Sequence, residues 1–251
     1  MKNIRKILRI IWIICGLSFT IVLIISFQAK GVDKTLLQSS DSVNIVNDSY
    51  KIEFTPLKSI KDSALIFYPG GFVDPKAYVP MARKITDNGY KVIIVKLPLR
   101  IAFSNSQKQE LFSRSKELIQ NDDEINHWVM AGHSRGGALA AEFVKDESKL
   151  VDSLILIGTT HPKEFDLSDL KIDVTKVFAT NDGLASEKEV FHPLEMKVLD
   201  HIIIGGTGYT SMAEKGIVPY QSKGTANYKE IALGPIPVEE KRNRFKHTHS
   251  R

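Results

Sequence analysis

Short apolar runs that alternate with amphipathic segments constrain the fold of this chain more than any other feature. Six runs are dominated by apolar and β-branched residues: ALIFYP, KVIIVKLP, HWVMAG, VDSLILIGTT, VTKVFATND and HIIIGG. Runs of this kind are typical of strands that are buried on both faces. Because helical patterns separate most of them, we expect an α/β fold, with a mostly parallel sheet flanked by helices.

Turn and cap signals place the connections between these runs. The alternating segment SVNIVNDSYKIEFTP has Asn47 and Asp48 at its centre and predicts a hairpin ahead of the first run. DPKAYVPMARKITDNGY predicts a helix that Asp74 caps, with Pro75 in its first turn and Gly89 at its end. NSQKQELFSRSKELIQND and GGALAAEFVKDES predict two more helices.

Ser134 lies at a pinch, GHSRG, between a predicted strand and a predicted helix. Ligands of a parallel sheet bind at the carboxyl ends of its strands, so this position belongs to the functional edge. A G-x-S-x-G pattern at such a turn holds its serine in a strained conformation with the hydroxyl exposed, and the helix that follows favours a developing negative charge. We interpret Ser134 as a candidate nucleophile; the alternative is a tight turn with an incidental serine.

Two further segments follow strands and should reach the same edge. FYPGGFVDP places Gly70 and Gly71 where an upstream backbone N–H should complete an oxyanion hole with the N–H of Arg135. ATNDGLAS places Asp182 after a strand and after the serine, which is the chain order serine, acid, histidine. The simpler interpretations are a glycine-rich turn and an Asn-Asp-Gly turn.

Four segments, IFYPGGFVDPKAYVPMARKI, YKVIIVKLPL, AGHSRGGALAA and ATNDGLAS, together resemble the α/β-hydrolase family, in particular its small members without a lid near the dienelactone hydrolases. The resemblance runs from about Ala64 to Ser186. It implies Ser134 as nucleophile, Asp182 as the triad acid, and backbone oxyanion donors at Gly71 and Arg135. Since 48 positions separate Ser134 from Asp182, no lid domain is expected and the site should be open.

The resemblance fails at the histidine that should act as base. It places a Gly-Gly-Asn-His pattern after the last strand, but this chain reads IIIGGTGYTSM there. His161 follows a strand and is the best substitute for the missing base. The favoured interpretation of His161 is nevertheless an ordinary turn residue. His133 is expected to pack beside the nucleophile. The remaining histidines are expected at the far edge (His127, His201), in a helical or turn segment (His192) and in the basic tail (His247, His249).

Residues 207–251 form a divergent and partly irregular segment beyond the predicted hydrolase domain of residues 43–206. Weak periodicity in GTANYKEIALGPIPVEEKRNRFKHTHSR favours an irregular structure. True divergence with loss of activity would explain the change. A reading-frame change in the gene near codon 207 would explain it equally well.

The N-terminus combines a basic head, residues 1–9, with an uncharged apolar stretch over residues 10–27. Eighteen helical residues span about 27 Å, close to the thickness of a bilayer core. The stretch is longer than a usual signal peptide core and lacks a clear cleavage site, which favours one transmembrane anchor over a cleaved signal that would release the protein. Basic residues ahead of the span place the N-terminus in the cytoplasm. Residues 28–42 would tether the body to the outer face of the membrane.

Charge and cysteine content exclude several classes of function. The formal net charge of +5 comes from the two ends of the chain, so the body has no basic field and no nucleic-acid partner is expected. A single cysteine, Cys15, excludes an intrachain disulfide, and no metal or organic cofactor is expected.

The sequence thus predicts a membrane-anchored serine hydrolase for a small ester-like or lactone-like substrate. The alternative is a non-catalytic protein of the same fold that binds a ligand or partner.

Overall fold

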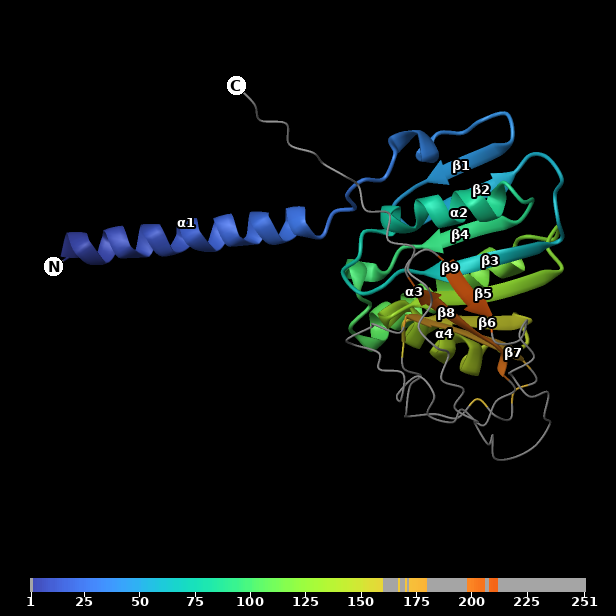
Figure 1. Cartoon of the computed structure of the whole chain (residues 1–251). Helices are drawn as coiled ribbons and strands as arrows, with labels where there is room; N and C mark the ends of the chain where they lie inside the picture. The colour runs from blue at the N-terminus through green and yellow to red at the C-terminus, as the bar shows by residue number, and fades with distance from the viewer. Residues whose placement is uncertain are drawn as a thin grey trace, which may run out of the picture.

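The structure is a computed structural model that describes residues 2–159, 167, 170, 172–179, 198–205 and 208–211. Among these residues, one sheet of nine strands forms the centre of the body, in the order β1-β2-β4-β3-β5-β6-β7-β8-β9 (Figure 1). The strands are β1 (Val43–Asn47), β2 (Lys51–Pro56), β3 (Ser63–Tyr68), β4 (Lys91–Val95), β5 (His127–His133), β6 (Ser153–Ile157), β7 (Asp173–Ala179), β8 (Val198–Gly205) and β9 (Gly208–Ser211).

The apolar runs form the parallel centre of the sheet, as predicted. Strands β4, β3, β5, β6, β7 and β8 are all parallel to their neighbours in this block. The predicted hairpin is the antiparallel pair β1 and β2, and β2 joins the centre antiparallel to β4. Strand β9, which the sequence did not predict, is antiparallel to β8 at the other end of the sheet.

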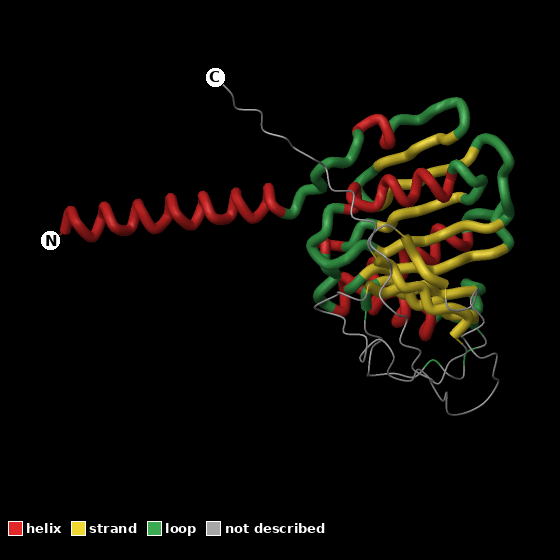
Figure 2. Tube along the Cα trace, viewed as in Figure 1, coloured by secondary structure: helices red, strands yellow, loops and turns green. Residues whose placement is uncertain are grey.

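Helices cover both faces of the sheet (Figure 2). They are α2 (Val79–Thr86), α3 (Asn105–Gln120) and α4 (Arg135–Asp146), preceded by α1 (Lys2–Ser26). The helix predicted from Asp74 is in fact two elements, a 3-10 helix over Pro75–Tyr78 that Asp74 caps, and then α2. Pro80 in the first turn of α2 has no N–H to continue the preceding helix, which accounts for the break.

Two apolar clusters hold the layers together. Leu111 and Phe112 of α3 and Leu139 and Phe143 of α4 pack with the side chains on one face of the sheet. Val79 and Ala82 of α2 pack on the opposite face, among Phe54, Phe67 and Ile94. Alternate residues of the strands therefore enter different clusters, which fixes the register of the sheet.

Helix α1 stands apart from the body (Figure 1). Its stretch Ile4–Ser26 has a mean hydropathy of 2.5 and is long enough to cross a membrane, and none of it is buried in the protein. A signal sequence near the N-terminus meets the same description. The segment that follows α1 does not project freely, because Val32, Leu36 and Leu37 pack against the cluster around α2.

Candidate active site

Ser134 occupies the turn between β5 and α4, with φ 51° and ψ −120°. The positive φ places Ser134 in a sparsely populated region that a residue with a Cβ adopts only at a cost of about 1–3 kcal/mol. Hydrogen bonds on both sides hold it there. The Ser134 N–H donates to the Ile157 carbonyl at 2.9 Å, and the Ser134 carbonyl accepts from the N–H of Gly137 at 2.9 Å and of Ala138 at 3.2 Å. Ser134 is partly exposed rather than enclosed in the core.

The glycines on either side of Ser134 are required by close backbone contacts. A Cβ on Gly132 would lie 2.3 Å from the Gly136 carbonyl oxygen, and a Cβ on Gly136 would lie 2.1 Å from the Tyr68 carbonyl oxygen. No side chain fits at such distances. The elbow predicted from G-x-S-x-G is therefore present, and α4 begins directly against the end of β3.

The loop after β3 brings Gly71 beside the elbow. A Cβ on Gly71 would lie 3.3 Å from Cβ of Arg135, so the two predicted oxyanion donors belong to neighbouring residues in space. The adjacent amides are occupied: the Gly70 N–H donates to Tyr78 Oη at 2.9 Å and the Phe72 N–H donates to the Arg100 carbonyl at 2.7 Å. Within the described part of the chain, neither the Gly71 amide nor the Arg135 amide has an acceptor.

Tyr78 fixes this arrangement, and sequence reasoning missed it. Its phenol oxygen accepts from the Gly70 N–H and lies 2.9 Å from Nδ1 of His133, the residue before the nucleophile. Burial raises the pKa of Tyr78, and the Gly70 hydrogen bond only partly offsets that effect. The phenol thus stays neutral and bonds to both segments. His133 packs beside the nucleophile, as predicted; Tyr78 itself has no local sequence signal, because it lies 55 positions away.

The side chain of Arg135 holds a third loop at the site. Its guanidinium donates to the carbonyls of Ile101 at 3.3 Å and of Ala102 at 3.0 Å. Three residues of this loop, Leu99, Arg100 and Ala102, have φ between 49° and 60°. Arg135 therefore contributes its backbone to the elbow and its side chain to the loop after β4.

The structure does not place the other predicted triad members. Asp182 and His161 lie outside the described residues, as do His192, His247 and His249. His127 is exposed at the start of β5 with Nδ1 3.6 Å from a carboxylate oxygen of Asp152, at the far edge as predicted. His201 was predicted to open a strand, but β8 begins at Val198, so His201 lies inside it.

The histidine position after the last parallel strand is occupied by a hairpin. Gly205 of β8 pairs with Gly208 of β9, so two residues connect the strands. This is where the resemblance would place the base. Among the described residues, no three His, Cys, Asp or Glu side chains gather as a metal site would require.

Comparison with known proteins agrees with this geometry. A family model described as the alpha/beta hydrolase family matches residues 64–204. The chain belongs to the α/β-hydrolase family. A search of curated proteins found no match.

Two solved structures of α/β-hydrolase type are similar in fold. A dienelactone hydrolase-like promiscuous phosphotriesterase from metagenomic libraries is 12% identical, with a TM-score of 0.50 over 64% of this chain and 82% of that one. An esterase from Pyrobaculum calidifontis is 16% identical, with a TM-score of 0.54 over 68% of this chain and 77% of that one. At these identities the likeness shows the α/β-hydrolase fold alone.

Proposed function

We propose that this protein is a serine hydrolase of ester-like or lactone-like bonds, with Ser134 as its nucleophile. The observation that carries the proposal is the conformation of Ser134, φ 51° and ψ −120°, at a strand-to-helix turn beside Gly71. Backbone strain at a polar residue on the ligand-binding edge of a parallel sheet is typical of a catalytic position. The esterase and dienelactone hydrolase-like structures of the same fold support the choice of bond.

In the proposed reaction, the Ser134 hydroxyl attacks the carbonyl carbon of the substrate. The amides of Gly71 and Arg135 donate hydrogen bonds to the carbonyl oxygen as it gains negative charge. The base takes the Ser134 proton and gives it to the leaving alcohol as the ester C–O bond breaks. The base then takes a proton from water, which attacks the acyl-enzyme, releases the acid and leaves Ser134 with its proton again. Asp182 is the proposed carboxylate that orients the base, and His161 is the candidate base.

The strength of catalysis depends on the base. Serine is a weak nucleophile until a neighbouring group takes its proton. Members of a catalytic triad act as a unit, so an enzyme without a well-placed histidine keeps only a small part of the rate. Because the β8–β9 hairpin lies at the usual histidine position, we expect slow hydrolysis unless His161 acts as the general base.

Labelling with a fluorophosphonate probe tests the nucleophile. The full-length protein should be labelled, and Ser134→Ala should abolish labelling and hydrolysis of p-nitrophenyl acetate. His161→Ala should lower the rate of labelling by about 10²-fold or more if His161 is the base. Labelling that persists in Ser134→Ala would contradict the proposal.

The alternative is a non-catalytic member of the family that binds a ligand at the same edge, and the β8–β9 hairpin favours it. Ligand binding that survives Ser134→Ala, without turnover of any ester, would support this second function.

We also propose that α1 anchors the protein in the cell membrane, with the N-terminus in the cytoplasm and the body outside. The basic residues at the start of α1 and its apolar length support this orientation. Protease treatment of intact cells should digest the body and leave a fragment that contains α1. Release of the body into the medium would indicate cleavage after α1 instead.

A further inference from the structure

The end of α1 contacts the loops that border Ser134. The ring of Phe27, the residue after α1, stacks on the ring of Phe72 with centroids 5.6 Å apart and an interplanar angle of 28°. Arg100 Nη1 donates to the Phe27 carbonyl at 2.9 Å, and the Ala29 N–H donates to Asp74 Oδ2 at 3.2 Å. Phe72 directly follows the candidate oxyanion donor Gly71, so only a few residues separate the end of α1 from the site.

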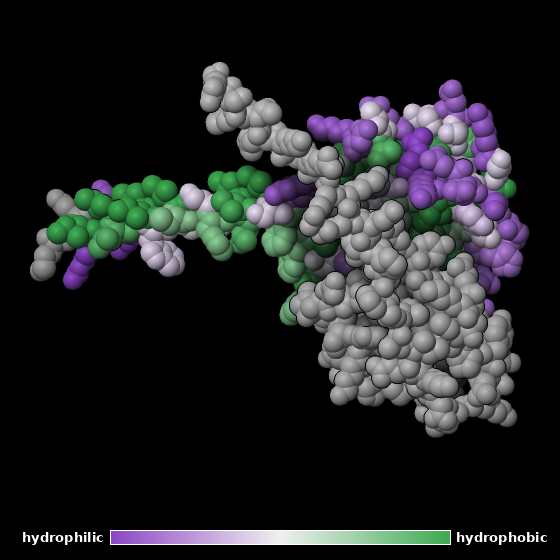
Figure 3. Space-filling model, in the orientation of Figure 1, coloured by the Kyte–Doolittle hydropathy of each residue, from purple (hydrophilic) through white to green (hydrophobic). Residues whose placement is uncertain are grey.

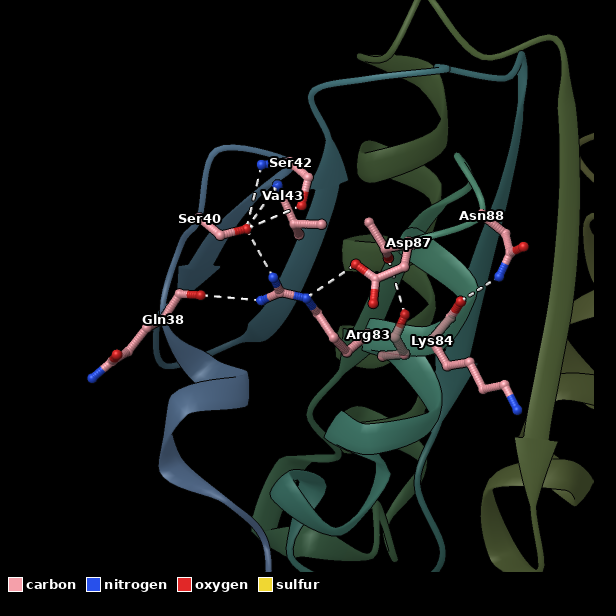
Figure 4. A network of polar contacts seen from close by, with 10 residues as sticks. Gln38, Ser40, Ser42, Val43, Arg83, Lys84, Asp87 and Asn88 are labelled. Carbon is pink, nitrogen blue, oxygen red and sulfur yellow. Dashed lines mark hydrogen bonds and ion pairs between the residues drawn. The ribbon is translucent and has the colours of Figure 1, made fainter.

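The next segment is fixed on the body, which limits how far the body can swing away from α1. Arg83 of α2 donates to the Gln38 carbonyl at 3.1 Å and to Ser40 Oγ at 2.8 Å (Figure 4). Asp87, the residue that directly follows α2, has a carboxylate oxygen 3.3 Å from Nε of Arg83 and holds its guanidinium in place. The chain from α1 to β1 is thus attached at both of its ends.

Apolar side chains are exposed around the same edge. Leu99 is 78% exposed and Phe103 is 82% exposed, on the loop that Arg135 holds through Ile101 and Ala102. The apolar surface of α1 continues onto the adjoining part of the body (Figure 3). Exposed large apolar side chains that gather at one place are typical of a membrane or partner contact.

The direction of the strands agrees with this surface. The carboxyl ends of β3, β4 and β5 point to the side of the body from which α1 extends (Figure 1). A bilayer that contains α1 would therefore lie on the side of the sheet that carries Ser134.

We propose that this edge rests on the bilayer, with Leu99 and Phe103 inserted at the lipid interface, and that Ser134 acts on amphipathic esters that partition into the membrane. The part of this inference that concerns the substrate rests on the proposed hydrolase function; the contact with lipid does not. Two apolar side chains that enter the interface add to the binding that α1 supplies, and they bring the candidate oxyanion hole to the depth of lipid headgroups.

Fluorescence quenching tests the contact with lipid. Cys15 is the only cysteine in the sequence, so the full chain with Cys15→Ser has none. In this background a single cysteine introduced by Leu99→Cys, Phe103→Cys or Ile60→Cys can be labelled with a nitrobenzoxadiazole dye. Ile60 is a matched control, because it is 62% exposed and lies in the loop before β3, at the opposite edge. The proteins are reconstituted in vesicles of phosphatidylcholine and phosphatidylglycerol with a nitroxide on the acyl chain.

We expect lipid nitroxides to quench the dyes at positions 99 and 103 and to leave the dye at position 60 unquenched. Equal quenching at all three positions would overturn the proposed contact. This measurement needs no catalysis, so it remains informative if Ser134 hydrolyses nothing.

Activity tests the substrate class. The double variant Leu99→Asp with Phe103→Asp should lower the ratio of hydrolysis of a vesicle-embedded long-chain ester to hydrolysis of p-nitrophenyl acetate by about tenfold or more. Ile60→Asp should leave this ratio unchanged. An unchanged ratio in the double variant would overturn the inferred substrate class. The proposed hydrolase function is tested separately by Ser134→Ala, which should abolish hydrolysis of both esters.

Discussion

The two ends of the parallel strands are built differently. Five of the six non-glycine residues with positive φ in the described structure lie at the carboxyl ends: Phe72, Leu99, Arg100, Ala102 and Ser134. At the amino ends, ordinary polar contacts close the turns. Lys91, which opens β4, lies 3.0 Å from a Glu53 carboxylate oxygen and 2.6 Å from one of Asp122, and the N–H of Trp128 donates to Asp152 at 2.8 Å.

This difference suggests that the amino ends of the strands contribute mainly to stability and that the carboxyl ends carry the proposed site. Strained residues persist only where their surroundings hold them, and such residues concentrate at functional sites. The amino ends of the strands use ion pairs and backbone hydrogen bonds, which stabilise the fold and require no unusual backbone. We therefore expect substitutions at the two ends to affect different properties.

The largest effect is expected for Gly136→Ala at the carboxyl ends. The added Cβ would lie 2.1 Å from the Tyr68 carbonyl oxygen, so α4 and β3 would have to separate. We expect a loss of at least about 3 kcal/mol in the free energy of unfolding, measured by urea denaturation in detergent. Gly16→Ala is the control, because a Cβ there meets no atom within 4 Å; equal stability of the two variants would remove the steric argument for the elbow.

At the amino ends, Lys91→Met should lower the free energy of unfolding by about 2 kcal/mol at pH 7 while leaving the proposed esterase activity unchanged. Burial alone would raise the pKa of Glu53, but the hydrogen bonds from Lys51 and Lys91 hold that pKa below its ordinary value. The pair therefore stabilises the protein above pH 4.5 and loses this effect as pH falls through the lower, folded-state pKa of Glu53. Stability curves of the two proteins should converge in acid, and a constant difference down to pH 2 would contradict this account.

Ser134 offers a direct measure of strain. Ser134→Gly removes the Cβ that opposes positive φ, so it should be more stable than Ser134→Ala by about 1 kcal/mol. Both variants should be inactive under the proposed function. Thermal unfolding of the two variants measures the difference, and a more stable Ser134→Ala protein would show that the turn is not strained.

The smallest effect is expected for His127→Ala. His127 is exposed and lies 3.6 Å from Asp152, so their interaction is screened by water. The free energy of unfolding should change by less than about 0.5 kcal/mol, with no change in labelling of Ser134. A large loss of activity would mean that the amino ends contribute to catalysis after all.

Local patterns in the sequence predicted most of the sheet and the elbow. The apolar runs specify buried strands, and the glycines around Ser134 specify a turn that no other residue fits. What the sequence did not predict depends on contacts between distant segments. Tyr78 meets His133 across 55 positions, and the residues after α1, predicted as a tether, bond to α2 through Gln38. Strand β9 is short and begins three positions after the end of β8, so its pattern of only four residues is too weak to identify.

The double contact of Tyr78 has a consequence for how the site tolerates movement. One phenol oxygen bonds to the Gly70 N–H and to the His133 ring, and Tyr78 itself ends the 3-10 helix that leads into α2. A shift of α2 would therefore carry the glycine loop and the elbow in the same direction, so the spacing between their two amides would be preserved even if the helix moved.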